Sequence, residues 1–296
     1  MANANGWGDG ASNNNIGWGK GADNAIGWGD IHADSWAGLT DIVGAAAFDA
    51  DAQAFITAAA ITDPTQQSAI NTLVVDLKGY SIWSKMKALY PMVGGTSSTH
   101  KWNLKDPRDL DAAYRLVFNG GWTHSSTGAT PNGTNGYADT KLTPSTNLTA
   151  SSAHFSKYNR TNDLVGSIKA DGCAAAAYAN FMQQNYVSAN GLIGEVGAVI
   201  SYTATDTRGL FTITRTSTNT QKLYRNLTSL GTSSFTINNI PAFDFYIGAR
   251  NDASVANSFN SYQCAFASIG DGLTDTDATN LYTAVQAFQT TLSRNI

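Results

Sequence analysis

The sequence predicts a mainly β protein in which an antiparallel sandwich follows a short helical region and precedes one C-terminal helix. From residue 92 onward, short runs of alternating apolar and polar residues are separated by clusters of Gly, Asn, Ser and Thr. Many short strands with turn signals between them are typical of a sandwich rather than of a βαβ fold. Charged residues make up only 14% of the chain. Its polarity comes instead from residue types that favour turns and strand faces.

Individual strands can be placed by their alternation, because successive side chains of a strand point to opposite faces. Most of the expected strands carry apolar residues at every second position, and turn residues separate them. The expected strands are residues 195–202, residues 210–216, residues 222–225, the pair Phe235 and Ile237, the run Phe243, Phe245 and Ile247, and the run Tyr262, Cys264 and Phe266.

Helices are expected before the sandwich, in a connector that spans residues 45–90. Asp49 and Asp51 precede a run rich in alanine, and Asp63 with Pro64 fits an N-cap with proline at the first helical position. The helix that follows has apolar residues at positions i, i+3, i+4 and i+7, which predicts one buried face. That face consists of Ile70, Leu73, Val74 and Leu77.

A further helix is expected at the end of the third region, the sandwich of residues 91–296. Thr274 and Asp277 have the spacing of a capping box, in which each side chain accepts a hydrogen bond from the other residue's backbone N–H. The apolar stripe of this helix consists of Leu281, Val285, Phe288 and Leu292.

The first 44 residues form a repeat built on Gly-Trp-Gly, which occurs at residues 6–8, 17–19 and 27–29. Gly-rich segments resist ordering, but Trp brings a large apolar surface with a polar N–H, which suits docking onto a partner. We interpret residues 1–44 as an attachment segment that orders against a partner or sister chains; a flexible leader is the alternative. Its contact residues would be Trp7, Trp18, Trp28 and Trp36.

Charge and hydropathy exclude several classes of partner. The net charge is −4 and no cluster of Lys and Arg occurs, so a nucleic-acid partner is not expected. The first residues lack the basic and apolar regions of a secretion signal, and no apolar run approaches the ~18 residues of a membrane helix. The two cysteines, Cys173 and Cys264, are expected to be buried and reduced, although their pairing is left open.

Several segments resemble known protein families. Residues 209–215, 222–226 and 245–250 resemble the concanavalin A/laminin-G-like jelly roll, in which a strand ending in Tyr-x-Asn leads into a hairpin and an Ile-Gly strand follows. Residues 265–292 and 83–105 resemble parts of structural proteins of tailed phages, including those that infect Bacteroidota. The likeness covers most of residues 48–296. It implies a virion structural protein (a head fibre, tail fibre or capsid decoration) that is assembled in the bacterial host cytoplasm.

This resemblance also implies partners. The N-terminal repeat would bind other virion proteins, and the chain would form a homo-oligomer, a trimer by analogy with fibres. The displayed jelly roll would bind a host surface glycan, since sugar sites combine aromatic faces with polar side chains. The candidate glycan-binding residues are Trp102, Trp122, Tyr137 and Tyr158, with a role in the sandwich core as the alternative for each.

Catalysis is not expected. Some members of this fold superfamily hydrolyse glycans with two glutamates on one strand, and retention requires two carboxyl groups about 5–5.5 Å apart. This chain has a single glutamate, Glu195. Its clustered aspartates stand at helix starts, where a carboxylate favours the helix dipole. We therefore predict no catalytic residues, with a polysaccharide depolymerase that uses an aspartate-based site as the alternative.

Metal binding is not expected either. The histidines, His32, His100, His124 and His154, are not spaced as metal ligands. The loops at residues 251–252 and 271–272 offer oxygen ligands suited to calcium, but the EF-hand pattern is absent. We name no metal site and no cofactor.

Overall fold

The computed structural model describes residues 47–164, 169–175, 179–185, 188–194, 199–203 and 205–296. The chain divides into two units, Met1–Phe48 and Asp49–Ile296. The Gly-Trp-Gly repeat with Trp7, Trp18, Trp28 and Trp36 lies outside the described residues. The fold that can be described is therefore that of the second unit, which contains most of the predicted helical connector and the whole predicted sandwich.

Two helices open this unit, as predicted. Asp49 caps α2 (Ala50–Ala58), and its side chain accepts from the backbone N–H of Asp51. Asp63 caps α3 (Pro64–Gly79) by accepting from Gln66 N at 2.8 Å. The predicted stripe of α3 is buried. A single turn of 3-10 helix (Trp83–Lys85) then leads into strand β1 (Met86–Tyr90).

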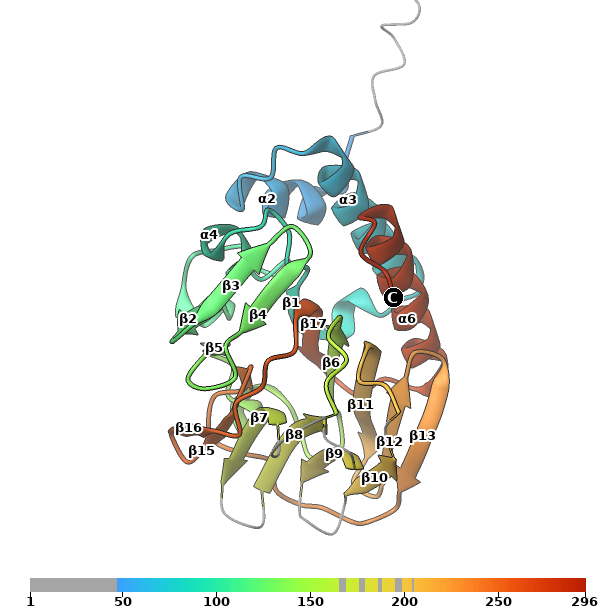
Figure 1. The fold of residues 1–296 in the computed structure, drawn as a ribbon. Coiled ribbons are helices and arrows are strands. Elements are labelled where there is room, and N and C mark those ends of the chain that lie inside the picture. The colour runs from blue at the N-terminus through green and yellow to red at the C-terminus, as the bar shows by residue number, and fades with distance from the viewer. Residues whose placement is uncertain (1–46, 165–168, 176–178, 186–187, 195–198, 204) are drawn as a thin grey trace, which may run out of the picture. The chain divides into compact units, whose positions relative to one another are not determined.

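The C-terminal helix α6 (Asp275–Thr291) also begins as predicted. Thr274 and Asp277 form the complete capping box. Leu281, Val285 and Phe288 are buried, whereas Leu292 is only half-buried. Helices α3 and α6 pack side by side (Figure 1). Three further short helical turns are α4 (Ser97–His100), the 3-10 turn Asp111–Ala113 and α5 (Pro144–Asn147).

The strands of the described residues form two sheets, and all but one of their pairings are antiparallel. The first sheet, sheet A, has the order β13 (Thr228–Ser233), β12 (Thr220–Arg225), β11 (Gly209–Ser217), β6 (Ala153–Asn159), β17 (Cys264–Gly270), β4 (Gly128–Pro131) and β3 (Trp122–Ser125), and β1 pairs with β17. The second, sheet B, has the order β10 (Ile200–Thr203), β9 (Ser188–Gly194), β8 (Ala179–Asn185), β7 (Lys169–Ala175), β14 (Tyr246–Ile247), β5 (Tyr137–Asp139) and β2 (Val117–Asn119). Strand β15 (Arg250–Asp252) pairs with β7 in parallel and with β16 (Val255–Asn257).

The hydrophobic core lies between the two sheets. Phe155 on β6 meets Phe245, which precedes β14, with ring centroids 4.5 Å apart. The opposite face of sheet A packs against α6, where the Tyr158 hydroxyl donates to Gln286 Oε1. Alternation along β6 thus assigns Phe155 to the core and Tyr158 to the helix layer. The structure confirms the predicted fold class, an antiparallel jelly-roll sandwich with an N-terminal helical region and a C-terminal helix.

One predicted strand is wrong. Residues 234–245, which include Phe235 and Ile237, form an irregular connection from sheet A to sheet B. Their backbone groups bond to loops rather than to a strand, since Ile237 N donates to Thr218 O and Phe245 N donates to Leu142 O. Pro241 has no N–H to donate to a ladder, which disfavours pairing inside a sheet. The predicted strand around Phe245 is shorter than expected and comprises Tyr246 and Ile247.

Candidate binding site

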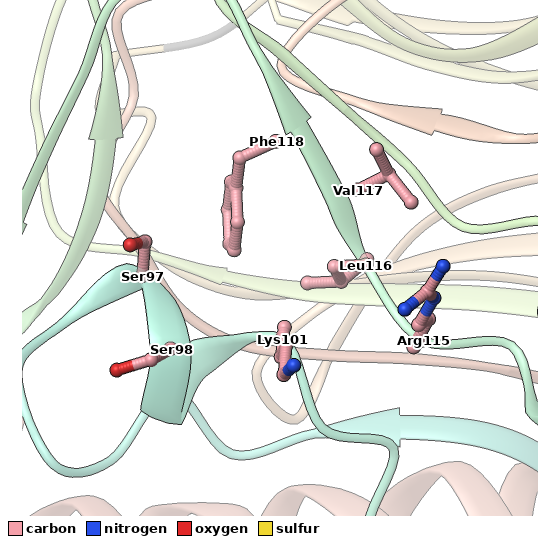
Figure 2. Close-up of a pocket in the computed structure, with 7 residues that line it drawn as sticks. All are labelled: Ser97, Ser98, Lys101, Arg115, Leu116, Val117 and Phe118. Carbon is pink, nitrogen blue, oxygen red and sulfur yellow. The ribbon is translucent and has the colours of Figure 1, made fainter. Parts of the chain in front are cut away.

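A pocket of ≈310 Å³ opens between α4 and the start of β2. Figure 2 shows its lining: Phe118 and Leu116 project from the β2 segment toward the side where Ser97 and Ser98 stand on α4. The two serines are exposed, whereas Phe118 is half-buried. The pocket is lined by Ser97, Ser98, Lys101, Arg115, Leu116, Val117 and Phe118.

The position of α4 is fixed by its cap. Thr96 and Thr99 form a reciprocal capping box across the helix start. Gly94 has φ +82°, and a Cβ there would lie 2.5 Å from Thr99 Cβ, so only glycine fits this turn. The turn therefore presents both serine hydroxyls at the rim of the pocket.

Two cations at the pocket share an acidic partner. Lys101 Nζ donates to Asp109 Oδ2 at 2.5 Å, and Arg115 donates to Asp109 Oδ1 at 2.8 Å. The hydrogen bond from Lys101, then that from Arg115, lowers the pKa of the Asp109 carboxyl. Arg115 also donates to Asp111 at 2.9 Å. These exposed pairs stabilise little, but they hold the cationic groups in place.

An aromatic cluster of Phe118, Trp122, His124 and His100 adjoins the pocket through Phe118, the one member that lines it. The chain crosses from sheet B to sheet A through Asn119-Gly120-Gly121, which brings β2 and β3 together. Phe118 meets Trp122 edge-on at 5.1 Å and His124 edge-on at 4.7 Å. Trp122 Nε1 donates to Asn119 O, and this bond fixes the indole beside the turn.

The two histidines of this cluster bond to each other. His100 Nδ1 and His124 Nδ1 are 2.9 Å apart, so one ring must donate and the other accept. Burial, and to a smaller extent the neighbouring His124 and Arg294, lowers the pKa of His100 to about 3. Burial also lowers the pKa of His124. Both rings are therefore neutral near pH 7.

None of the four predicted aromatic residues lines this pocket, although Trp122 and Trp102 each contact a residue that does. Trp122 packs against Phe118, and Trp102 is half-buried with Lys101 Nζ 4.8 Å from its ring centroid. Tyr137 stands opposite Asn119 in the β5–β2 pair and stacks on Tyr246 at 4.5 Å.

Tyr158 lies elsewhere. Its side chain is 0% exposed, and its hydroxyl also accepts from Ile296 N at 2.8 Å. Tyr158 is buried between sheet A and α6 rather than in the core between the sheets, and a buried ring presents no face to a sugar.

The sequence prediction missed the residues that line the pocket. Phe118 ends an apolar run that begins with the buried Leu116, so the sequence does not distinguish it from a core residue. A local signal was present in Phe118-Asn-Gly-Gly-Trp122, where two aromatic residues flank a turn. Gly120 has φ +68°, and a Cβ there would meet Asn135 O at 2.0 Å, so this turn depends on glycine.

The acidic residues considered for catalysis have structural partners. Asp49 and Asp277 cap helices, and Asp106 pairs with Arg108. Glu195 lies outside the described residues. Within the described part of the chain, no group of three or more His, Cys, Asp or Glu side chains could hold a metal ion. Cys173 and Cys264 are buried free thiols, and burial raises the pKa of Cys264 to about 12.

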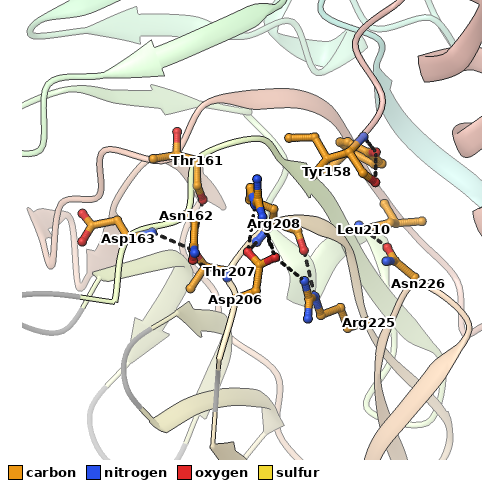
Figure 3. A network of polar contacts seen from close by, with 11 residues as sticks. Tyr158, Thr161, Asn162, Asp163, Asp206, Thr207, Arg208, Leu210, Arg225 and Asn226 are labelled. Atoms are coloured by element: carbon orange, nitrogen blue, oxygen red, sulfur yellow. Dashed lines mark hydrogen bonds and ion pairs between the residues drawn. The ribbon is translucent and has the colours of Figure 1, made fainter.

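A second polar network joins residues 161–162, residues 206–208 and Arg225, the last residue of β12 (Figure 3). Asp206 accepts from Arg208 and pairs with Arg225 at 3.0 Å. Thr207 is buried and bonds to both Asn162 Oδ1 and Thr161 O. Since these polar groups are satisfied by one another, the network holds the loops together.

Comparison with known proteins places the fold. No family model matches the sequence, and no curated protein matches it. A mutant of Trypanosoma rangeli sialidase that displays trans-sialidase activity is 10% identical, with a TM-score of 0.51 over 75% of this chain and 39% of that chain. The binding domain of botulinum neurotoxin serotype D is 10% identical, with a TM-score of 0.44 over 69% of this chain and 52% of that chain.

Domain 4 of AbnA, an extracellular arabinanase from Geobacillus stearothermophilus solved with arabinotriose, is 12% identical with a TM-score of 0.39. It covers 67% of this chain and 98% of its own. This chain spans less than two thirds of the sialidase and neurotoxin chains. At 10% identity the sialidase shows a shared fold and nothing further. Among the described residues, no helix has the length and apolar character needed to cross a bilayer.

Proposed function

We propose that this chain is a carbohydrate-binding protein displayed on the outside of a tailed-phage virion, as a head fibre, a tail fibre or a capsid decoration. The pocket between α4 and β2 carries the binding part of the proposal. Its Phe118 ring offers an apolar face for a sugar, and Ser97 and Ser98 offer hydroxyls that both donate and accept. Its volume of ≈310 Å³ suits a small ligand such as one sugar ring.

The cations add orientation to this site. Lys101 and Arg115 line the pocket, and both bond to Asp109. Their remaining N–H groups are donors for sugar hydroxyls. Because Asp109 and Asp111 neutralise the two cations locally, the pocket favours an uncharged sugar over a strongly acidic one.

The virion part of the proposal rests on the sequence. The Gly-Trp-Gly repeat provides attachment to other virion proteins, and homo-oligomerisation through its Trp side chains, as a trimer, would bury their apolar surface. Low charge and high Asn, Ser and Thr content suit a domain that faces the outside of a particle.

A glycan-binding assay tests the pocket. The purified chain is screened against surface polysaccharides of Bacteroidota, and the affinity for a bound glycan is measured for the wild type and for Phe118→Ala. Losing the stacking ring should weaken binding about tenfold or more, which corresponds to ~1.4 kcal/mol. The double variant Ser97→Ala, Ser98→Ala should also bind more weakly, without disturbing the aromatic cluster.

Phe235→Ala is the matched control, since Phe235 is 41% exposed and lies beyond β13, at the opposite edge of sheet A from β3. It should bind as the wild type does. Equal affinity of the pocket variants and the wild type would reject this site. Release of reducing ends from the bound polysaccharide would instead support a depolymerase.

A further inference from the structure

A lysine and an aspartate meet inside the sandwich, between the two sheets. Lys157 belongs to β6 of sheet A, and Asp171 belongs to β7 of sheet B. Lys157 Nζ lies 2.9 Å from each of the two Asp171 carboxylate oxygens. Each side chain is 1% exposed. The pair therefore spans the core and links the sheets directly.

The surroundings of this pair are dry but polar. Asp171 Oδ1 also accepts from the backbone N–H of Gly248 at 2.7 Å. Lys157 Nζ lies 5.9 Å from the ring centroid of Tyr262. Asn159 stands two positions further along the same face of β6, and its buried amide atoms have no hydrogen-bond partner within the described structure. Keeping two full charges in such a place costs several kcal/mol per ion before their mutual attraction is counted.

We propose that Lys157 and Asp171 condense into an intramolecular amide, an isopeptide bond that joins sheet A to sheet B. The Lys157 ammonium first passes a proton to Asp171 Oδ2, which leaves a neutral amine and a carboxylic acid. The amine then attacks Asp171 Cγ, and the new N–C bond forms as Oδ2 leaves with two protons as water. Ammonium and carboxylate become amide and water, so no oxidant, cofactor or second substrate is consumed.

The geometry favours this step. Lys157 Nζ is equally far from the two Asp171 carboxylate oxygens. The carboxyl carbon, which is bonded to both oxygens, therefore lies within the roughly 3–3.5 Å of Nζ that a near-attack arrangement requires. The Gly248 N–H points at Oδ1, where negative charge develops as Nζ adds to the carbon. Burial keeps out the water that would hydrate the amine, and the product amide carries no charge into the core.

Other lysine–aspartate pairs in the chain provide internal comparisons. Lys85 and Asp277 are 2.6 Å apart, and Lys141 and Asp139 are 2.8 Å apart. Their lysine side chains are 32% and 28% exposed, so water solvates the ammonium groups. We expect these pairs to remain ionic. Burial, rather than proximity, is therefore the condition that decides whether a lysine–aspartate pair forms an amide.

Mass spectrometry of the full chain tests the bond. After denaturation and reduction, the wild type should be lighter than its sequence mass by one water. Trypsin should fail to cut after Lys157, and peptide 142–160 should appear joined to peptide 170–208. The Lys157→Met variant should have the full mass of its own sequence and yield the second peptide unjoined.

The peptide map also separates the amide from a chemical alternative. Asp171 precedes Gly172, and a succinimide at that step would remove one water as well. A succinimide leaves cleavage after Lys157 intact and joins no peptides. A linear map of the wild type, with or without loss of water, would overturn the proposal, and this readout does not depend on whether the variant folds. The result is also independent of glycan binding and of virion assembly.

Discussion

Burial, more than residue type, determines the acid–base behaviour of single side chains in this protein. His100 is 1% exposed, bonds through Nδ1 to His124, and has no partner for Nε2 within the described structure. His154 is buried as well, between Asp271 O at 2.6 Å and Ser268 Oγ at 3.2 Å. Burial lowers the pKa of His154 to about 4, against the opposing effect of the bond to Asp271 O. Both rings must become charged without water nearby if they are protonated in the folded state.

Acid should therefore destabilise the fold through His100. Its folded pKa of about 3 lies below the ordinary value of 6.5. Between these values the unfolded chain binds more protons, so the free energy of unfolding falls as the pH falls. From pH 6.5 to pH 4 this one group should remove on the order of 3 kcal/mol.

Urea unfolding of wild type and His100→Gln at both pH values measures this contribution. The variant should lose less stability on acidification, while His154 and the ion-paired aspartates contribute equally to both proteins and cancel. Identical losses in the two proteins would contradict a neutral, buried His100.

At the scale of elements, the helices follow from local signals and the sheets do not. The residues that cap α3 and α6 lie within four positions of each helix start, so the sequence alone predicts these caps. Strand β6, in contrast, pairs with β11 and β17, which lie far along the chain. Such pairings depend on the whole fold, and they cannot be deduced from alternation. The connection at residues 234–245 has the alternation of a strand, but it pairs with loops instead.

Helix α6 offers a quantitative test of its cap. Thr274 Oγ1 accepts from Asp277 N and donates to Asp277 Oδ2, and Lys85 Nζ donates to the same oxygen at 2.6 Å. Burial alone would raise the pKa of Asp277, but the bonds from Lys85 and Thr274 outweigh it and lower the pKa. Thr274→Ala should reduce the free energy of unfolding by about 0.5–2 kcal/mol.

The matched control is Thr283→Ala on the same helix. Thr283 is exposed, and its hydroxyl only bonds back to Thr279 O. That variant should stay within about 0.5 kcal/mol of the wild type. An equal effect of both substitutions in thermal or urea unfolding would show that the cap adds nothing specific.

At the scale of the whole molecule, predictability differs between the scaffold and the site. The fold class and the terminal helices could be predicted, because periodicity and caps are repeated along the chain. The pocket could not be predicted: Phe118 and the serines of α4 line it, and none of the predicted aromatic residues does. A pocket forms where distant segments meet, here α4 and β2, and no single segment encodes that meeting. Tyr158 shows the converse, an aromatic residue in a strand whose neighbours bury it.

The division of the chain into two units predicts that folding and assembly depend on different residues. The unit Asp49–Ile296 has its own core, and its first helix is tied down by Asp49 N donating to Asn71 Oδ1 at 2.7 Å. A chain lacking residues 1–44 should therefore fold with an unchanged thermal midpoint and an unchanged glycan affinity. It should nevertheless be missing from phage particles, because the proposed attachment residues are gone. Immunoblotting and antibody-gold labelling of purified particles measure this, and gold on the head or on the tail tip would also locate the protein.

Full-length chain with Trp7, Trp18, Trp28 and Trp36 all changed to Ala separates the contacts from mere length, since it should be excluded as well. Normal incorporation of the truncated chain would assign attachment to the folded unit instead, and the absence of label from wild-type particles would reject the virion role.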